Sequence, residues 1–316
     1  MAQNKLNILF VFGFNYSLKL WRDSGALERE FYYFEKLGKE KNIHFTLITY
    51  GDSEDYNLIE SEHLSIIPIY SLLKKTDSKV ISLFQSIVFP FMIYKNLSHI
   101  EIIKQNQITG SWVSIIFKYL LKKPLYVRTG YDAYLFSISD KKNIFKRGFF
   151  KILTRACLNY SDLYSVTSKS DYEFILSNYN FEESKLVLRP NWVLVGDSNT
   201  DIYNKKDNLI LSVGRLEKQK NYHFLISMLK NKNLELTIVG DGSEKENLLN
   251  SAKANQVKLN IEKNLNYHEL LDLFRNYKYF ILPSIYEGNP KVLLEAMSQG
   301  LIVFASNISN HEEIID

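Results

Sequence analysis

The sequence predicts an α/β protein with two consecutive doubly wound, Rossmann-like domains, and three observations support this. With 316 residues, the chain exceeds the length at which one hydrophobic core usually keeps growing. Short apolar runs alternate with amphipathic segments, as expected for parallel strands joined by helices. The alternation stops at the polar stretch 196–208 and then restarts. We therefore expect an N-terminal domain at 1–195 and a C-terminal domain at 196–316.

The first half opens with an expected strand at 6–14 and a helix at 24–38, where apolar residues recur at helical spacing. Further strands of this half are expected at 44–49, 64–69, 124–128, 163–167 and 185–188. In the second half we expect strands at 209–213, 235–239, 258–261, 279–282 and 302–305, with helices starting at Tyr222, Ser243, His268 and Pro290. Ligands of such sheets bind at the carboxyl ends of the strands, here in a cleft between the two halves.

The composition excludes several classes of protein. A net charge of +4 is too weak to indicate nucleic-acid binding, although it suits anionic partners such as a diphosphate or a membrane surface. The single Cys157 excludes an intrachain disulfide and fits a reducing compartment. No small-residue cleavage site follows the first apolar run, and the longest apolar stretch, 80–94, is interrupted by polar residues and falls short of a membrane span. We therefore expect a cytoplasmic protein.

The most informative segment is 283–296, which follows an expected strand. Asn289 can cap a helix, and Pro290 suits the first helical position. Glu287 then lies on the loop, Gly288 lets the backbone approach a ligand, and Glu295 lies one to two turns inside the helix. The helix start suits a phosphate, and the two carboxylates suit sugar hydroxyls and a ribose diol. By spacing alone, a solvated loop glutamate and a surface helix glutamate are the favoured alternative.

A second candidate is the basic loop after the strand at 209–213. Gly214 makes a turn there, and Arg215 and Lys220 lie five positions apart before a helix, which suits a diphosphate. A solvated lysine-rich loop is the alternative. Gly240 lies at another strand–turn–helix junction, which a structural turn explains equally well.

The segment PSIYEGNPKVLLEAMSQG at 283–300 resembles the E-x7-E signature of family 4 glycosyltransferases, the retaining GT-B enzymes among the glycosyl transferases of group 1. This resemblance implies that Glu287 contacts the hydroxyls of a donor sugar and that Glu295 contacts the nucleotide ribose. It also places the backbone of three following residues near the diphosphate: Asn289, Pro290 and Lys291.

The resemblance extends to two other turns. Residues 214–221 resemble the family's G-R-L-x-x-x-K-N segment, which implies that Arg215 and Lys220 clamp the phosphates beside Gly214. Gly240 matches the family's Gly-Asp-Gly turn near the donor. At 262–267, the loop that contacts the base in the family, Lys263 stands where a glycine is frequent, which leaves the nucleobase unassigned.

The N-terminal half carries weaker signals. Residues 23–30 resemble the family's glycine loop, with Gly25 retained and Ser24 in place of the second glycine, and a plain helix start capped by Ser24 is the alternative. Asp132 lies where many relatives have a histidine, and it is the candidate for orienting the acceptor hydroxyl. Residues 145–151 mix basic and aromatic side chains. We interpret them as a basic helix face with its apolar side in the core; a weak peripheral contact with the inner face of an anionic membrane is the alternative.

These observations predict a retaining, hexosyltransferase-type enzyme that uses a nucleoside diphosphate sugar. The expected acceptor is a carbohydrate or a lipid-linked glycan, in surface polysaccharide or glycoconjugate synthesis. No Asp-x-Asp metal motif is evident, because the acidic segment 52–55 fits a surface loop, so we expect no metal and no cofactor. A sugar-nucleotide epimerase and a non-catalytic sugar-nucleotide-binding protein are the alternatives. The second rests on the chain ending where relatives continue into a last strand and a C-terminal helix.

Overall fold

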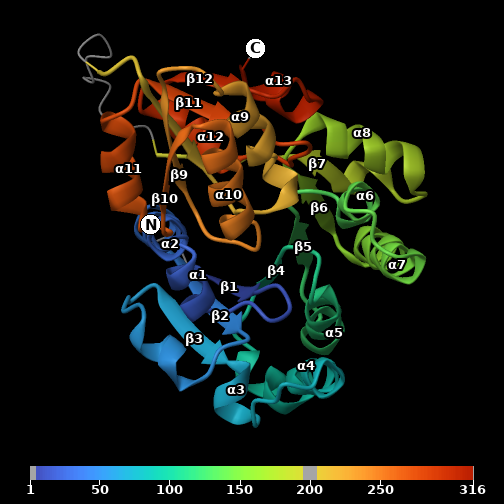
Figure 1. Ribbon diagram of the computed structural model, residues 1–316. Coiled ribbons are helices and arrows are strands. Elements are labelled where there is room, and N and C mark those ends of the chain that lie inside the picture. The colour runs from blue at the N-terminus through green and yellow to red at the C-terminus, as the bar shows by residue number, and fades with distance from the viewer. Residues whose placement is uncertain (1–4, 195–204, 316) are drawn as a thin grey trace. The chain divides into compact units, whose positions relative to one another are not determined.

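The computed structural model describes residues 5–194 and 205–315, which divide into two units. The first comprises Met1–Thr167 and Asp171–Arg189, and the second comprises Ser168–Ser170 and Pro190–Asp316. Each unit contains one parallel sheet with helices, which confirms the predicted fold class (Figure 1). Residues 196–204 of the expected linker lie outside the described residues.

The sheet of the first unit has seven parallel strands in the order β3-β2-β1-β4-β5-β6-β7. The strands are β1 Leu6–Val11, β2 Ile43–Thr49, β3 Leu64–Pro68, β4 Ile102–Asn106, β5 Leu125–Arg128, β6 Leu163–Val166 and β7 Leu186–Leu188. The sequence predicted all of these strands except β4. The missing strand is central, since β4 pairs with both β1 and β5.

The polar residues of β4 explain why the sequence pattern did not reveal it. Gln105 is fully buried, and its amide nitrogen donates to the carbonyl oxygens of Asn106 and Thr109 at 3.2 and 3.4 Å. The ammonium group of Lys104 lies 5.1 Å from the centre of the Phe10 ring. These tertiary contacts accommodate a glutamine and a lysine in a central strand.

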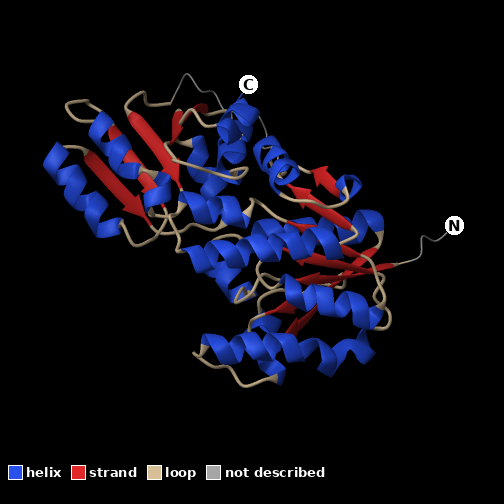
Figure 2. Cartoon of the chain, turned by 90° about the vertical axis from the view of Figure 1, so that its right-hand side faces the viewer, coloured by secondary structure: helices blue, strands red, loops and turns tan. Residues whose placement is uncertain are grey.

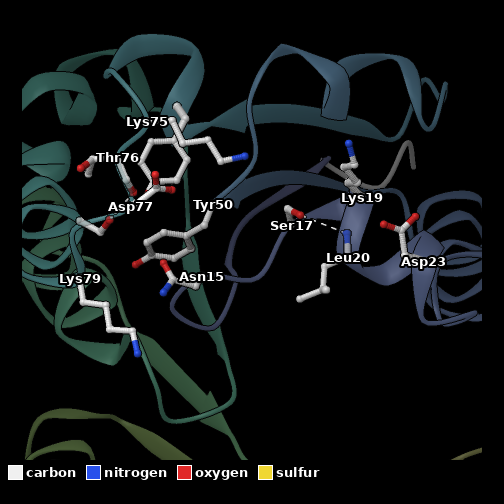
Figure 3. Close-up of a pocket in the computed structure, with 12 residues that line it drawn as sticks. Asn15, Ser17, Lys19, Leu20, Asp23, Tyr50, Lys75, Thr76, Asp77 and Lys79 are labelled. Atoms are coloured by element: carbon white, nitrogen blue, oxygen red, sulfur yellow. Dashed lines mark hydrogen bonds between the residues drawn. The ribbon is translucent and has the colours of Figure 1, made fainter. Parts of the chain in front are cut away.

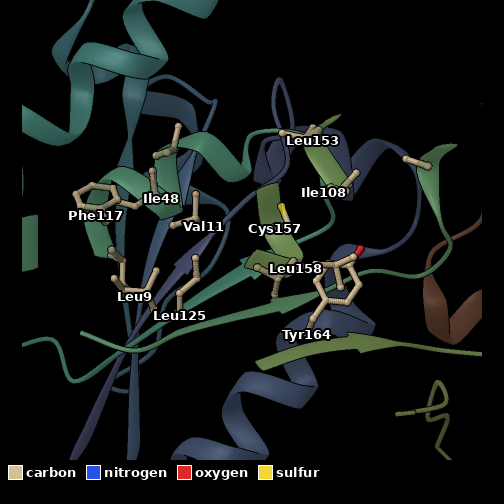
Figure 4. Close-up of a cluster of buried hydrophobic side chains, with 14 of the residues drawn as sticks. Leu9, Val11, Ile48, Ile108, Phe117, Leu125, Leu153, Cys157, Leu158 and Tyr164 are labelled. Atoms are coloured by element: carbon tan, nitrogen blue, oxygen red, sulfur yellow. The ribbon is translucent and has the colours of Figure 1, made fainter. Parts of the chain in front are cut away.

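Helices cover both faces of this sheet (Figure 2). They are α1 Leu18–Asp23, α2 Leu27–Lys41, α3 Ile69–Leu72, α4 Lys79–Ile93, α5 Ser111–Leu121, α6 Ala133–Ser139, α7 Ile144–Tyr160 and α8 Lys169–Asn178. Alternate residues of β1 point to opposite faces, so Phe10 and Phe12 pack with α1 and α2. Leu9 and Val11 pack in the larger cluster with α4, α5 and α7, where Cys157 is buried (Figure 4).

The predicted helix start at Ser24 is wrong. Ser24 ends α1 instead, where its hydroxyl donates to the carbonyl oxygen of Trp21, and α2 begins at Leu27. Gly25 connects the two helices with a φ of 73°, a conformation that glycine adopts without strain. The glycine is therefore explained by the junction of α1 and α2.

The sheet of the second unit has five parallel strands in the order β10-β9-β8-β11-β12. They are β8 Leu209–Val213, β9 Glu235–Val239, β10 Lys258–Glu262, β11 Tyr279–Leu282 and β12 Ile302–Ala305, each predicted to within one residue. Its helices are α9 Tyr222–Met228, α10 Lys245–Asn255, α11 Tyr267–Arg275, α12 Lys291–Ser298 and α13 Ser309–Ile315. Because the chain builds outward from β8 on one side and then returns to add β11 on the other, the strand order reverses between β8 and β11.

One segment among the described residues, Lys79–Leu97, is long and apolar enough to cross a membrane by length and composition. The sequence-based statement that this stretch falls short is therefore wrong on those two criteria. Its most apolar window is 33% buried, and Phe89 and Ile93 pack in the core of the first unit. Helices of soluble proteins that pack on one side pass the same test.

Candidate functional site

The loops that follow β8 and β11 meet at the carboxyl edge of the second sheet. Gln219 joins them, because its carbonyl oxygen accepts from the Ile285 amide at 2.9 Å and its side-chain nitrogen donates to the Tyr286 carbonyl at 2.8 Å. The exposed guanidinium of Arg215 donates to the side-chain oxygen of Gln219 at 3.1 Å. The sequence analysis missed Gln219, since its partners in the second loop, Ile285 and Tyr286, lie more than sixty positions away along the chain.

Lys220 and Glu287 form a buried ion pair at this edge. Their residues are 8% and 9% exposed, the ammonium group contacts Oε1 of Glu287, and the Ser284 hydroxyl donates to the same oxygen at 2.7 Å. A solvated loop glutamate, the alternative that spacing favoured, does not match this burial. A buried ion pair contributes little net stability because desolvation offsets the attraction. We therefore regard the pair as a candidate binding group.

The glycines of this edge allow the loops to pack closely. A Cβ on Gly240 would lie 2.1 Å from the carbonyl oxygen of Gly214, and a Cβ on Gly214 would lie 2.9 Å from the Tyr222 hydroxyl. The loops after β8 and β9 thus touch backbone to backbone, a contact that a larger residue would prevent. Gly288 lies in the buried stretch 287–290 before α12.

The start of α12 differs from the prediction. The helix begins at Lys291 with Pro290 as its N-cap and no side-chain cap, so Asn289 is not the capping residue. Asn289 instead accepts from the Asn191 amide at 3.1 Å through Oδ1, and its carbonyl accepts from Asn191 Nδ2 at 2.6 Å. The N-cap Pro290 has no side chain that could cap the helix, and the positive end of the α12 dipole suits an anion.

Two charged side chains of α12, Lys291 and Glu295, have different surroundings. The ammonium group of Lys291 lies 5.4 Å from the centre of the Trp192 ring, which the sequence analysis did not consider. Glu295 is the fifth residue of α12 and is 1% exposed, as expected for a position inside the helix rather than on its solvated face.

His311 is a candidate that sequence reasoning missed. It is 1% exposed, its Nδ1 lies 2.9 Å from the Ser306 carbonyl, and its Nε2 has no hydrogen-bond partner among residues 5–194 and 205–315. Burial lowers its pKa, while the hydrogen bond to Ser306 and the nearby charge of Glu287 oppose that shift. A buried imidazole thus lies near enough to the ion pair for the charges of Glu287 and Lys220 to act on its pKa. The only sequence signal is a histidine soon after β12.

Asp132 in the first unit has a structural role. It is fully buried and caps α6, accepting from the Leu135 amide at 2.7 Å and from the Thr154 hydroxyl at 3.4 Å. Burial, together with the nearby carboxylate of Asp171, raises its pKa to about 6. Both oxygens are engaged, and the side chain does not reach the surface, so we do not assign it a role toward an acceptor.

The first unit has a hollow of 370 Å³ at the carboxyl ends of β1, β2 and β3 (Figure 3). The Tyr50 ring lines it, and the Tyr50 hydroxyl is buried without a hydrogen-bond partner among the described residues. Burial raises the pKa of this phenol. The lining is mostly polar: Asn15, Ser17, Lys19, Asp23, Lys75, Thr76, Asp77, Lys79 and Ser82, with Leu20, Tyr50 and Tyr70.

The acidic segment 52–55 borders this region, and its expected surface position is wrong for Asp55. That carboxylate is 1% exposed and accepts from the Thr49 hydroxyl at 2.6 Å and from the Leu18 amide at 3.2 Å. Asp55 thus holds the start of α1. Among residues 5–194 and 205–315, no three His, Cys, Asp or Glu side chains are grouped to hold a metal ion.

Comparisons with known proteins agree with these features. Residues 198–316 match the family model of the glycosyl transferases group 1. The chain is 35% identical over 108 residues to the amylovoran biosynthesis glycosyltransferase AmsD of Erwinia amylovora, covering 33% of this chain and 31% of that protein. It is 30% identical over 168 residues to the UDP-Gal:alpha-D-GlcNAc-diphosphoundecaprenol alpha-1,3-galactosyltransferase of Escherichia coli, covering 46% and 42%.

A third relative is the N-acetylgalactosamine-N,N'-diacetylbacillosaminyl-diphospho-undecaprenol 4-alpha-N-acetylgalactosaminyltransferase of Campylobacter jejuni. The identity is 32% over 176 residues, covering 51% of this chain and 46% of that protein. The matched segments thus span less than half the length of these three curated relatives.

Solved structures resemble the whole chain. Sucrose-phosphate synthase from Thermosynechococcus elongatus superposes with a TM-score of 0.78 at 18% identity, covering 98% of this chain and 83% of that one. The lipopolysaccharide outer core galactosyltransferase WaaB gives 0.66 at 17%, covering 98% and 84%. The class defined by this likeness is the GT-B fold, with two parallel-sheet α/β domains. Within that class, residues 198–316 match the glycosyl transferases group 1, and the named relatives to which parts of the chain are similar are glycosyltransferases.

Proposed function

We propose that this chain is a retaining glycosyltransferase of family 4 that transfers a sugar from a nucleoside diphosphate sugar to a carbohydrate or lipid-linked acceptor. We further propose that it acts in surface polysaccharide or glycoconjugate synthesis, as the names of the relatives suggest. The observation that carries the proposal is the buried Lys220–Glu287 pair between β8 and β11. Ligands of open α/β sheets bind where the strand order reverses, and this pair lies there.

Charge develops on the leaving diphosphate as the glycosidic bond breaks. The proposed groups that stabilise it are Lys220, Arg215 and the positive end of the α12 dipole. Donors fixed before the reaction lower the barrier most, because they need no reorganisation in the transition state. Gln219 serves this purpose indirectly, since it holds Arg215 against the loop after β11. The proposed donor contacts also include the backbone of Gly214, Gly240 and Gly288.

Glu287 is proposed to accept hydrogen bonds from the donor sugar, and Glu295 from the nucleotide ribose. Without a sugar, Lys220 and Ser284 both donate to Oε1 of Glu287. Hydroxyl groups of a bound sugar would add donors to this carboxylate and thereby support its buried charge. A sugar whose hydroxyl groups reach Glu287 would thus lower the free-energy cost of burying the ion pair. Lys220 and Glu287 would therefore favour such a sugar over one without these hydroxyl groups.

The proposed acceptor site is the hollow of the first unit. Its lining combines an aromatic ring with amide, hydroxyl and charged groups, which suits a polar glycan head group. The aromatic ring of Tyr50 offers a stacking face to a sugar ring, and the polar groups around it can exchange hydrogen bonds with sugar hydroxyls. No catalytic metal or cofactor is assigned to either site.

The test is transfer from a panel of UDP, GDP and ADP sugars to glycan and lipid-linked acceptors. Arg215→Ala should lower kcat/KM by about 10²-fold or more, as for other transition-state donors. Glu287→Gln should also lower kcat/KM, because the charged acceptor for the sugar hydroxyls is lost. Arg275→Ala is the matched control, since this exposed arginine on α11 pairs only with Asp272 among the described residues. Undiminished transfer by both site variants would refute the assignment.

The same reaction products distinguish the alternatives. NMR of the product should show the donor's anomeric configuration, and an inverted product would refute the retaining mechanism. Conversion of the donor without acceptor would indicate an epimerase instead. Donor binding by calorimetry without turnover on any acceptor would indicate a sugar-nucleotide-binding protein.

A further inference from the structure

Helix α4 exposes seven of its large apolar residues and buries both of its serines. Ser82 and Ser86 are 5% and 0% exposed, whereas Val80, Phe84 and Phe91 are 78%, 66% and 55% exposed. Trp112 donates to the buried Ser86 hydroxyl at 2.9 Å, so the polar side is fixed toward the protein. Four more large apolar side chains are exposed on this helix: Ile81, Leu83, Ile87 and Met92. This pattern is the reverse of a helix that faces water.

Helix α7 has the same property at its start. Ile144, Phe145, Phe149 and Ile152 are all exposed, with Phe145 at 85%. A Cβ built on Gly148, between these residues, would meet no atom within 4 Å. The interpretation of 145–151 as a helix with its apolar side in the core is therefore wrong for Phe145 and Phe149, which face away from it.

The two helices belong to one layer of the first unit. Helix α5 packs against both α4 and α7, and all three contribute to the same core cluster beneath them (Figure 1). Phe89 of α4, Phe117 of α5 and Cys157 of α7 are fully buried in it. The exposed side chains lie on the opposite sides of these helices, so they point outward from the same layer.

The segment that contains these helices is also strongly basic. Residues 74–160 contain 15 Lys and Arg but only 4 Asp and Glu, and one of these four, Asp132, is buried. The rest of the chain contains 24 basic and 31 acidic residues. The positive charge of the protein is therefore concentrated in the segment that carries the exposed apolar helices.

We infer that the outer face of α4 and α7 binds the surface of an anionic lipid bilayer. Apolar side chains enter the headgroup region, and lysine and arginine attract anionic lipids, so helices with both properties bind such membranes. A second copy of the chain is a poorer occupant. A twofold contact through this face would bring two basic surfaces together, and like charges repel.

The position of α4 connects this surface to the hollow of the first unit. Lys79 and Ser82, in the first turn of α4, line that hollow. If the proposed function holds, a lipid-linked acceptor would present its head group at this end of the membrane-bound helix. The membrane inference does not depend on this point, because it rests on exposure and charge alone.

The test is flotation of the purified chain with vesicles of phosphatidylcholine and phosphatidylglycerol at three to one, and with vesicles of phosphatidylcholine alone. Phe84→Ser/Phe91→Ser should weaken binding to the anionic vesicles by about tenfold or more, because two apolar side chains are lost from the interface. Lys146→Glu/Arg155→Glu should weaken it by about fivefold per charge removed, with a weaker salt dependence than the wild type.

Matched controls lie in the second unit. Phe224→Ser removes a phenylalanine that is 54% exposed, close to Phe91 at 55%, and Lys230→Glu/Lys253→Glu makes the same charge change at exposed positions. These variants should bind as the wild type does.

Equal binding by the α4 variant and the Phe224 variant would overturn the inference, as would no binding to anionic vesicles. A dimer in solution that Phe84→Ser/Phe91→Ser dissociates, without vesicle binding, would assign the face to a second copy. Each readout is independent of glycosyl transfer, so its failure would leave the proposed function standing.

Discussion

Replacing Lys220 with methionine should destabilise the second unit by about 3–5 kcal/mol. The substitution keeps most of the side-chain volume but leaves the carboxylate of Glu287, 9% exposed, without its cation. Removing one partner of a buried ion pair has this cost because an uncompensated charge stays in a medium of low polarity. The Ser284 hydroxyl still donates to Oε1, so we expect a value near the lower limit.

The double variant Lys220→Met/Glu287→Gln gives the sharper measurement. It removes both charges together, so it should be more stable than the sum of the two single effects predicts, by about 1–3 kcal/mol. The control is the exposed pair of Lys258 and Glu235, whose side chains are 70% and 42% exposed. Lys258→Met should change the free energy of unfolding by less than about 1 kcal/mol.

Urea denaturation measures these free energies, and hydrogen exchange of peptides from β8 and β11 assigns the loss to the second unit. Two results would refute the reasoning. One is a Lys220→Met variant within about 0.5 kcal/mol of the wild type, which is the range of an ordinary surface substitution. The other is strict additivity in the double variant, which would mean that Lys220 and Glu287 do not interact.

Three further predictions concern pH and packing. The pKa of Asp132 is about 6 in the folded chain and about 3.9 in the unfolded chain, so its negative charge opposes folding at neutral pH. Asp132→Asn should therefore stabilise the chain by about 2 kcal/mol at pH 8. That gain should vanish near pH 4, and equal effects at both pH values in urea denaturation would contradict it. The pKa of His311 is lowered in the fold, so protonating this side chain favours the unfolded chain. The free energy of unfolding should therefore fall as the pH drops below about 6.5, and His311→Gln should reduce this fall between pH 7 and pH 5. An unchanged slope would show that His311 does not take part. Gly240→Ala should cost about 1–3 kcal/mol, because its Cβ would meet the Gly214 carbonyl at 2.1 Å, whereas Gly148→Ala, which meets nothing, should not destabilise; similar thermal midpoints would contradict this.

The strands of the second sheet were predicted closely because each is a short apolar run with breaks at its ends. β9, β11 and β12 match the expected residues fully. β4 was missed for the opposite reason, since its glutamine and lysine are stabilised by groups distant in sequence. Periodicity reports which residues are apolar, and it does not report which polar residues find partners in the fold.

The same limit applies to the ends of helices. Asn289 is of a residue type that caps helices well. Its side-chain oxygen and its carbonyl oxygen both accept hydrogen bonds from Asn191 instead, a residue 98 positions away in the sequence. Serine is a common residue at helix starts, but Ser24 follows the last residue of α1 and is the C-cap of that helix. Capping preferences amount to about 1 kcal/mol, so one tertiary hydrogen bond can outweigh them.

The candidate donor site combines features that the sequence pattern reveals with contacts that only the fold creates. The spacing of Glu287 and Glu295 and the glycines of the three turns were visible in the sequence, but the partner that joins two loops, Gln219, was not. The parallel order places β8 beside β11, which brings Lys220 to Glu287 although they lie 67 positions apart. Apolar residues of similar size would stabilise this position as well or better than an ion pair. The chain buries two opposite charges where its strand order reverses, and the proposed binding of a charged, hydroxyl-rich ligand would account for both.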